Sequence, residues 1–221
     1  MKSLLNAAAA ALALATPMTA HAAAYEFTTA PISFDSQLSL GFTFTTNSAI
    51  SVTHLGYFDH MGDGFLTDHE VGIFDMAGTL LVSTLLGSGT GDALTGHFRY
   101  KSIAPFALAA GQSFVIAATT FGASDPWAYG NTPSTITGFT VDPSISIGNN
   151  ASLYTYQGDN ILRKPVSSIA YTVYAGPNFL SAGVGAVPEP ASWALMIAGF
   201  GLVGSALRKT SRRQLATVSA A

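Results

Sequence analysis

The sequence predicts an all-β protein: an antiparallel β-sandwich that follows an N-terminal signal peptide and precedes a single C-terminal transmembrane helix. Three observations support this fold class. Apolar and polar residues alternate in many short segments, Gly, Pro, Asn and Asp separate those segments, and both long apolar segments lie near the ends of the 221-residue chain. Short strands with turns between them are typical of immunoglobulin-like and jelly-roll sandwiches, and the pattern does not choose between these two.

The first 22 residues have the three parts of a secretory signal peptide. Lys2 precedes an apolar segment at 4–15, and the small residues Ala20 and Ala22 form an A-x-A cleavage site. The apolar segment is too short to span a bilayer as a helix. We therefore expect cleavage after Ala22, with cleavage after Ala24 as the alternative.

Period-two alternation predicts the strands of the folded domain, residues 23–180. Residues 38–44 alternate Leu and Phe with Ser, Gly and Thr, and residues 50–57 resume the alternation after a Thr-Asn-Ser break. Residues 71–84 form a predicted hairpin, because the sequence Asp-Met-Ala-Gly at 75–78 has the composition of a tight turn.

Later segments repeat the pattern more weakly. Phe98 and Tyr100 alternate with Arg99 and Lys101, which predicts that both cations lie on the solvent-exposed face. Further strands are expected where apolar residues alternate, at 114–118, 137–141, 145–147 and 169–173. Small residues without an apolar pattern at 181–187 predict a flexible linker.

The part of the chain between its two apolar ends is acidic. Residues 23–187 contain eleven acidic and four basic residues, a net charge of −7, whereas the whole chain has a formal net charge of −3. Such a surface repels phosphate backbones, so nucleic acid is excluded as a partner. The chain has no cysteine, which excludes disulfides, thiol catalysis and thiolate metal sites.

The C-terminal segment, residues 188–213, has the features of a membrane anchor. The sequence Pro-Glu-Pro precedes an apolar run at 191–207 that contains no charged residue and is at the lower length limit for a spanning helix. An interfacial tryptophan and a basic cluster that would stay on the cytoplasmic side complete the predicted anchor: Trp193, Arg208, Lys209, Arg212 and Arg213. Residues 214–221 form a short tail of polar and small residues.

The Pro-Glu-Pro motif, the apolar span and the basic end, in this order, resemble the PEP-CTERM sorting signal of Gram-negative bacteria. Pro188, Glu189 and Pro190 match the motif itself. The resemblance implies export to the cell envelope or cell surface, at least transient anchoring in the membrane, and an exosortase-type processing enzyme as partner. It also implies a link to exopolysaccharide and biofilm. Residues 214–221 depart from the usual signal, which ends soon after its basic cluster, and an ordinary single-pass anchor is the alternative.

About residues 38–118 also resemble a β-sandwich domain of unknown function that often accompanies such tails. The resemblance lies in Gly-Tyr-Phe-Asp at 56–59, His-Glu-Val-Gly-Ile-Phe-Asp at 69–75, Gly-Thr-Leu-Leu at 78–81 and the stretch 105–114. It implies the fold and brings no agreed activity.

One loop, residues 59–70, has the composition of a calcium site. It matches an EF-hand-type loop at the first, fifth, sixth and twelfth positions, and a backbone carbonyl would bind at the seventh. The predicted ligands are Asp59, Asp63, the carbonyl of Phe65 and Glu70, with Gly64 at the bend. Met61 occupies the third position, where an oxygen ligand is expected. Calcium is thus the candidate cofactor, and a solvated acidic loop is the alternative.

Other chemistry has weaker signals. His60 and His69, with His54 nearby, are residue types that bind zinc, but their spacing follows no helical pattern. The chain lacks a G-x-S-x-G motif and a glycine-rich phosphate loop before a helix. We therefore predict a non-enzymatic envelope or matrix protein, with a calcium- or zinc-dependent hydrolase of an extracellular polymer as the alternative.

Two pairs of aromatic residues are candidates for sugar binding: Trp127 with Tyr129, and Tyr154 with Tyr156. Trp127 and Tyr129 lie in a stretch with Asp, Pro, Gly and Asn, which predicts a loop where their rings would be exposed. An exposed ring can stack on the apolar face of a sugar, which would bring exopolysaccharide to the domain. The alternative is that these rings fill the sandwich core or close one of its ends.

Overall fold

The structure of the chain is a computed structural model. It describes residues 21–34, 37–120, 125–131, 135–169, 173–183, 197, 199 and 200. The predicted signal peptide up to residue 20 lies outside the described residues, as do the end of the linker, the Pro-Glu-Pro motif, Trp193, the basic cluster and the tail at 214–221. Ala20–Gly185 form one compact unit, and all strands and all core residues named below belong to it.

Three residues of the predicted transmembrane span at 191–207 are described. Ile197, Gly199 and Phe200 have helical backbone conformation. Among the residues that the structure describes, no helix has the length and hydropathy needed to cross a membrane.

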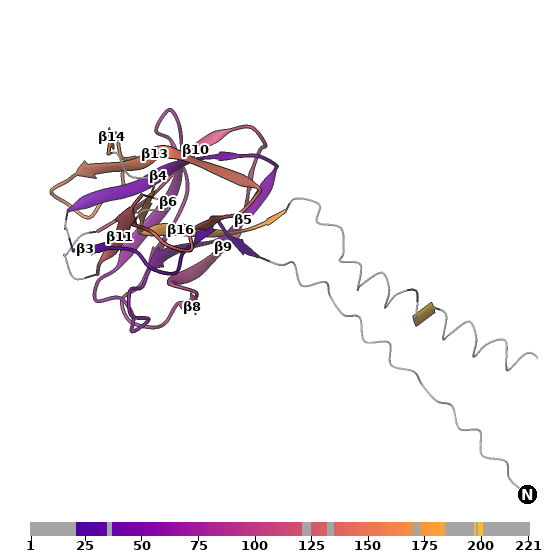
Figure 1. Cartoon of the computed structure of the whole chain (residues 1–221), viewed down its shortest axis with the longest axis horizontal. Coiled ribbons are helices and arrows are strands. Elements are labelled where there is room, and N and C mark those ends of the chain that lie inside the picture. Colours follow the sequence, from indigo (N-terminus) through magenta and orange to yellow (C-terminus); the bar gives the residue numbers. More distant parts are fainter. Residues whose placement is uncertain are drawn as a thin grey trace, which may run out of the picture. The chain divides into compact units, whose positions relative to one another are not determined.

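The larger of the two main sheets has six antiparallel strands in the order β14-β13-β4-β10-β6-β7. Figure 1 labels all of these strands except β7. In that order its strands are β14 (Ser167–Ser168), β13 (Ile145–Tyr156), β4 (Leu38–Thr46), β10 (Ser113–Thr119), β6 (His69–Asp75) and β7 (Leu80–Leu86). A register shift between Ile147 and Ser152 interrupts the pairing of β13 with β4, as a β-bulge does.

The second main sheet has five antiparallel strands in the order β1-β16-β5-β9-β8. In that order its strands are β1 (Ala22–Ala23), β16 (Pro177–Gly183), β5 (Ile50–Phe58), β9 (Phe98–Leu108) and β8 (Ala93–Thr95). Two small sheets consist of β15 (Val173–Ala175), β11 (Trp127–Gly130) and β3 (Ile32–Ser33), and of β12 (Thr140–Val141) and β2 (Tyr25–Glu26).

Both main sheets contribute side chains to one apolar core. Phe44 on β4 and Phe179 on β16 come from different sheets, and their ring centroids are 5.1 Å apart. Tyr25 contacts Phe42 from the six-stranded sheet and Phe98 from the five-stranded sheet, with ring centroids 5.3 Å and 5.4 Å apart. All five rings are buried. Removal of this aromatic surface from water is the main favourable term that holds the two sheets together.

The prediction of an all-β, antiparallel fold is confirmed. The alternation at 38–44 and 50–57 corresponds to β4 and β5, and the hairpin at 71–84 corresponds to β6 and β7. In the turn, the backbone N–H of Thr79 donates to the Asp75 carboxylate at 2.7 Å, as expected for an Asp that begins a turn.

The end of the body lies later in the chain than the predicted domain boundary at residue 180. Strand β16 continues to Gly183 and pairs with β5, so the first three residues of the predicted linker belong to the sheet. Ala182 is buried there. The small residues at 181–183 predicted a flexible linker, but small side chains also fit into a strand that is closely packed against its neighbours.

The prediction that Arg99 faces solvent is wrong. Lys101 is exposed as predicted, but Arg99 is buried. The segments 59–62 and 90–92 cover this side of β9 and receive the guanidinium group through hydrogen bonds. Alternation alone identifies the face on which a side chain lies, and it gives no information about loops that fold over that face.

Candidate functional site

The loop that joins β5 to β6 is held at its start by the carboxylate of Asp59. This carboxylate accepts hydrogen bonds from the backbone N–H groups of Gly62, at 3.1 Å, and Gly64, at 3.0 Å. Both glycines have positive φ angles, 70° and 101°, which other residues adopt at a cost. The glycines therefore let the chain fold back over its own carboxylate.

Arg99 neutralises this carboxylate. Its Nε donates to Oδ2 of Asp59 at 2.6 Å, and both side chains are buried. The other guanidinium nitrogens donate to the carbonyls of Asp92, at 2.9 Å, and Gly62, at 2.8 Å. A buried ion pair is tolerated only when its remaining donors and acceptors are satisfied, and these contacts satisfy most of them.

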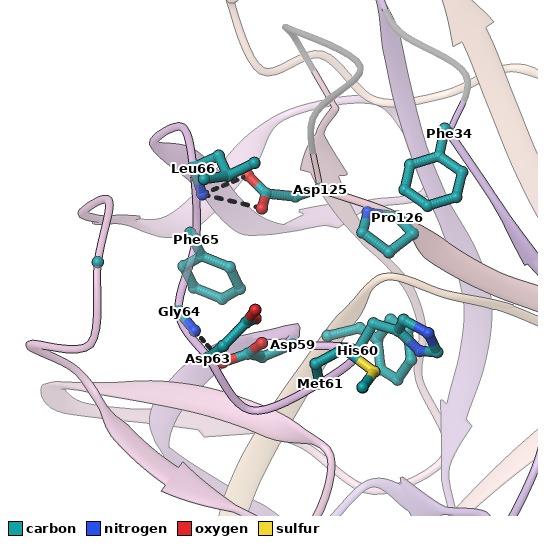
Figure 2. A pocket seen from close by; sticks show the side chains of 12 residues that line it. Phe34, Asp59, His60, Met61, Asp63, Gly64, Phe65, Leu66, Asp125 and Pro126 are labelled. Carbon is teal, nitrogen blue, oxygen red and sulfur yellow. Dashed lines mark hydrogen bonds between the residues drawn. The ribbon is translucent and has the colours of Figure 1, made fainter.

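Asp125 holds the other end of the same loop. Its carboxylate accepts a hydrogen bond from the backbone N–H of Leu66 at 2.9 Å (Figure 2). The carboxylate also accepts hydrogen bonds from the backbone N–H of Thr67, at 3.0 Å, and from the Thr67 hydroxyl, at 3.1 Å. It also contacts Nε2 of His69 at 3.1 Å. Burial raises the pKa of Asp125, but the hydrogen bonds from His69, Leu66 and Thr67 outweigh burial, so its pKa lies below the ordinary value.

His69 is held through both ring nitrogens. Nδ1 lies 2.8 Å from the carbonyl oxygen of Thr119, and Nε2 lies 3.1 Å from the Asp125 carboxylate. The ring is buried, stacks on Tyr57 at 4.0 Å between centroids, and meets the edge of Phe65 at 5.0 Å.

An open pocket of about 420 Å³ lies beside this doubly held loop (Figure 2). Its rim carries three large apolar side chains that are unusually exposed: Phe34 at 52 %, Met61 at 74 % and Leu66 at 73 %. The exposed residues His60 and Asp63 add polar groups. The remaining lining residues are Phe58, Asp59, Gly64, Phe65, Gly89, Asp125 and Pro126.

The structure does not assemble the predicted calcium ligands. Asp59 is paired with Arg99, and the carbonyl of Phe65 accepts the N–H of Gly89 at 2.7 Å. Glu70 lies on β6, where it accepts a hydrogen bond from the Ser83 hydroxyl at 3.1 Å, and Asp63 is exposed. The alternative prediction, a solvated acidic loop, describes the loop only in part, because Asp59 is buried.

The three predicted zinc ligands lie in different surroundings. His69 is buried between Thr119 and Asp125, whereas His60 is exposed at the pocket. His54 lies on β5, where its Nδ1 contacts the Thr53 hydroxyl at 3.0 Å. Within the described ranges, no three His, Asp or Glu side chains gather in a way that would hold a metal ion.

The first pair of candidate sugar-binding rings lies on a strand. Trp127 begins β11 and is only 4 % exposed, and it meets Tyr174 edge-on at 4.6 Å between ring centroids. It packs with Leu38 in a small apolar cluster, and Tyr129 is half-buried beside it. Trp127 therefore does not present an exposed face. The second pair, Tyr154 and Tyr156, lies on β13, where Tyr156 is 70 % exposed.

Residues 186–213 match the PEP-CTERM protein-sorting motif. The chain carries a PEP-CTERM sorting signal. The match contains the Pro-Glu-Pro sequence, the apolar run and the basic cluster, so the resemblance seen in the sequence is confirmed. It implies a secreted protein that is sorted through its C-terminal tail and associates with the membrane or envelope, and exosortase-type enzymes recognise this motif. No curated protein matches the sequence.

Proposed function

We propose that this chain is a non-enzymatic protein of the cell envelope or extracellular matrix whose body contacts exopolysaccharide through the pocket beside residues 59–66. The body is proposed to be an immunoglobulin-like or jelly-roll sandwich, which is supported by the core that its two main sheets share. The observation that carries the proposal is the combination of a sorting signal at 186–213 with a rigidly held, apolar-rimmed pocket on the body.

The buried charged groups at the pocket support a binding role over catalysis. A general acid or base must exchange protons with a substrate, but Asp59 and Asp125 already accept several hydrogen bonds from the chain and each contacts a basic side chain. Their contacts fix the loop, and a fixed loop keeps a binding pocket in shape without loss of conformational entropy on binding.

The chemistry of the pocket matches a neutral or amine-bearing sugar ring. The exposed side chains of Phe34, Met61 and Leu66 offer apolar contact for the face of a pyranose, and Asp63 and His60 offer partners for hydroxyl or amino groups. The net charge of −7 on residues 23–187 disfavours a polyanionic chain.

A binding screen tests this proposal. The body, residues 23–185, is titrated with neutral, amine-bearing and anionic polysaccharides, with and without calcium. We expect binding of a neutral or amine-bearing polymer, and its loss in Phe34→Ala. Ile161→Ala is the matched control, because Ile161 is 57 % exposed, close to the 52 % of Phe34, and does not line the pocket. Equal losses in both variants, or preference for polyanions, would contradict the proposal.

The same screen addresses the alternative of a metal-dependent hydrolase. Shortening of any polymer during incubation, abolished by a chelator, would favour hydrolysis over binding. The sorting step is tested in cells, where Glu189→Ala is expected to change the size or location of the mature protein. Unchanged processing would favour an ordinary membrane anchor.

A further inference from the structure

The edges of the two main sheets are unequal. The strand orders end at β1 and β8 in one sheet and at β14 and β7 in the other. Three of these four edge strands have only two or three residues, whereas β7 has seven. Short edge strands are one way in which proteins prevent unwanted pairing with other chains, and β7 lacks this protection.

Strand β7 also lacks the charged residues and prolines that usually protect an edge. Its sequence is Leu-Leu-Val-Ser-Thr-Leu-Leu, and Leu80 and Leu85 are 42 % and 50 % exposed. The neighbouring part of β9 that lies beyond its pairing with β8 carries Lys101 and Pro105, which are typical protective residues. Residues that protect a strand edge are therefore present on β9, next to β7, and absent from β7 itself.

One contact identifies the outer side of β7. Nζ of Lys101, on β9 in the other sheet, donates to the backbone carbonyl of Leu85 at 2.8 Å. In an antiparallel strand the backbone groups of alternate residues point to the same side, so the N–H and C=O of Ser83 share the side of Leu85. Among the described residues, β7 pairs with β6 alone, and another strand can pair with this outer row once it displaces Lys101 from the Leu85 carbonyl.

We propose that β7 pairs antiparallel with β7 of a second copy of this chain. The strand is close to a palindrome about Ser83, so a two-fold axis there places Leu80 opposite Leu86 and Leu81 opposite Leu85, with the β-branched Val82 opposite Thr84. A C2 interface requires such self-complementarity, and cross-strand apolar and β-branched pairs stabilise sheets. Strand β7 of a second copy therefore fits this edge.

Charge and geometry limit the strength of this contact. Each body carries a net charge of −7, so two copies repel each other at long range. The pairing of β7 with β6 shifts register between Ile73 and Phe74, which makes the edge less regular. Association is therefore expected to be weak in dilute solution, to increase with salt, and to be favoured when many copies are held on one surface.

Cysteine cross-linking tests the pairing in a chain that has no cysteine of its own. Ser83→Cys places two thiols opposite each other, with Cα atoms about 5.5 Å apart, a separation that suits a disulfide. We expect the body, residues 23–185, to form disulfide-linked dimers on mild oxidation at high protein concentration. Thr95→Cys on β8 is the matched control, because it is exposed on another edge strand, and it is expected to stay monomeric.

Two further variants address the edge itself. Leu85→Lys in the Ser83→Cys background is expected to abolish cross-linking, since it places a charge on the edge. Lys101→Ala frees the Leu85 carbonyl and is expected to increase cross-linking. Sedimentation of the cysteine-free protein must show salt-promoted self-association that Leu85→Lys removes. Equal cross-linking at positions 83 and 95, or a monomer at every concentration and salt level, would overturn the proposal.

Discussion

Two buried carboxylates hold the same loop at its two ends, and they differ in the basic side chain that each one faces. Asp59 faces Arg99 at the start of the loop, and Asp125 faces His69 at its end. The guanidinium of Arg99 is always charged and donates to Asp59 and to backbone carbonyls, whereas the imidazole of His69 places one nitrogen at Asp125 and the other at the Thr119 carbonyl. The first contact is therefore a permanent ion pair with further hydrogen bonds, and the second is a single contact between one imidazole nitrogen and a carboxylate.

In the part of the chain that the structure describes, backbone N–H groups and one basic side chain surround a carboxylate at each end of the loop. A bound calcium ion would fix a loop by the reverse arrangement, with several oxygens around one cation. The predictions below test whether the two ends contribute as differently as their basic partners suggest.

The largest effect is expected from removal of the permanent cation. Arg99→Ala leaves the Asp59 carboxylate buried without a partner, and loss of one member of a buried pair costs about 3–5 kcal/mol. We expect a decrease of this size in the free energy of unfolding of the body, measured with urea. Arg163→Ala is the control, because its ion pair with Asp159 is exposed, and it should change stability far less. A similar small loss in both variants would contradict a structural role for Arg99.

A smaller effect is expected at the other end of the loop. Asp125→Asn keeps one oxygen acceptor but removes the charge that faces His69, and hydrogen bonds to charged groups contribute about 1.5–3 kcal/mol. Urea unfolding should show a loss within this range, smaller than that of Arg99→Ala. Asp63→Asn is the matched control, because Asp63 is exposed at the pocket rim. A loss equal to that of Arg99→Ala would make the two ends equivalent.

Local patterns predict the parts of this protein that local residues determine. The β6–β7 hairpin follows from turn residues that hydrogen-bond within a few positions, such as Asp75 and Thr79. The sorting signal is read in order along the chain and needs no tertiary contact. The alternation of β4 follows from a strand with one face toward the core.

The candidate site depends on contacts between residues far apart in the sequence. Asp59 and Arg99 are 40 positions apart, and His69 and Asp125 are 56 positions apart, so no short window contains either pair. The calcium prediction also has a physical explanation. In an acidic loop with glycines, the carboxylates can bind a cation, or they can accept hydrogen bonds from backbone N–H groups of the loop. Both arrangements require acidic residues and glycines, so the sequence does not distinguish them. Arg99, which decides between them, lies on another strand.

The acid response of the body should depend on Asp125. Its pKa in the folded protein lies below the ordinary value, so its contribution to stability is present above about pH 3.9, the usual value for Asp. The contribution decreases as the pH falls through the folded-state pKa. We therefore expect the stability difference between the wild type and Asp125→Asn to narrow between pH 5 and pH 2, measured by thermal unfolding. A constant difference would show that the Asp125 charge contributes nothing.

The smallest expected effect is that of calcium. In the wild-type body, Asp59 is neutralised by Arg99 and the carbonyl of Phe65 is hydrogen-bonded to Gly89, so added Ca²⁺ would have to displace existing partners. We expect no rise in the melting temperature when calcium replaces a chelator. Asp63→Ala provides the comparison, because it removes the one predicted carboxylate ligand that is exposed. A calcium-dependent rise in the wild type that is absent from Asp63→Ala would mean that the loop rearranges around a metal ion, and the comparison of Arg99 with His69 would then describe only the metal-free state.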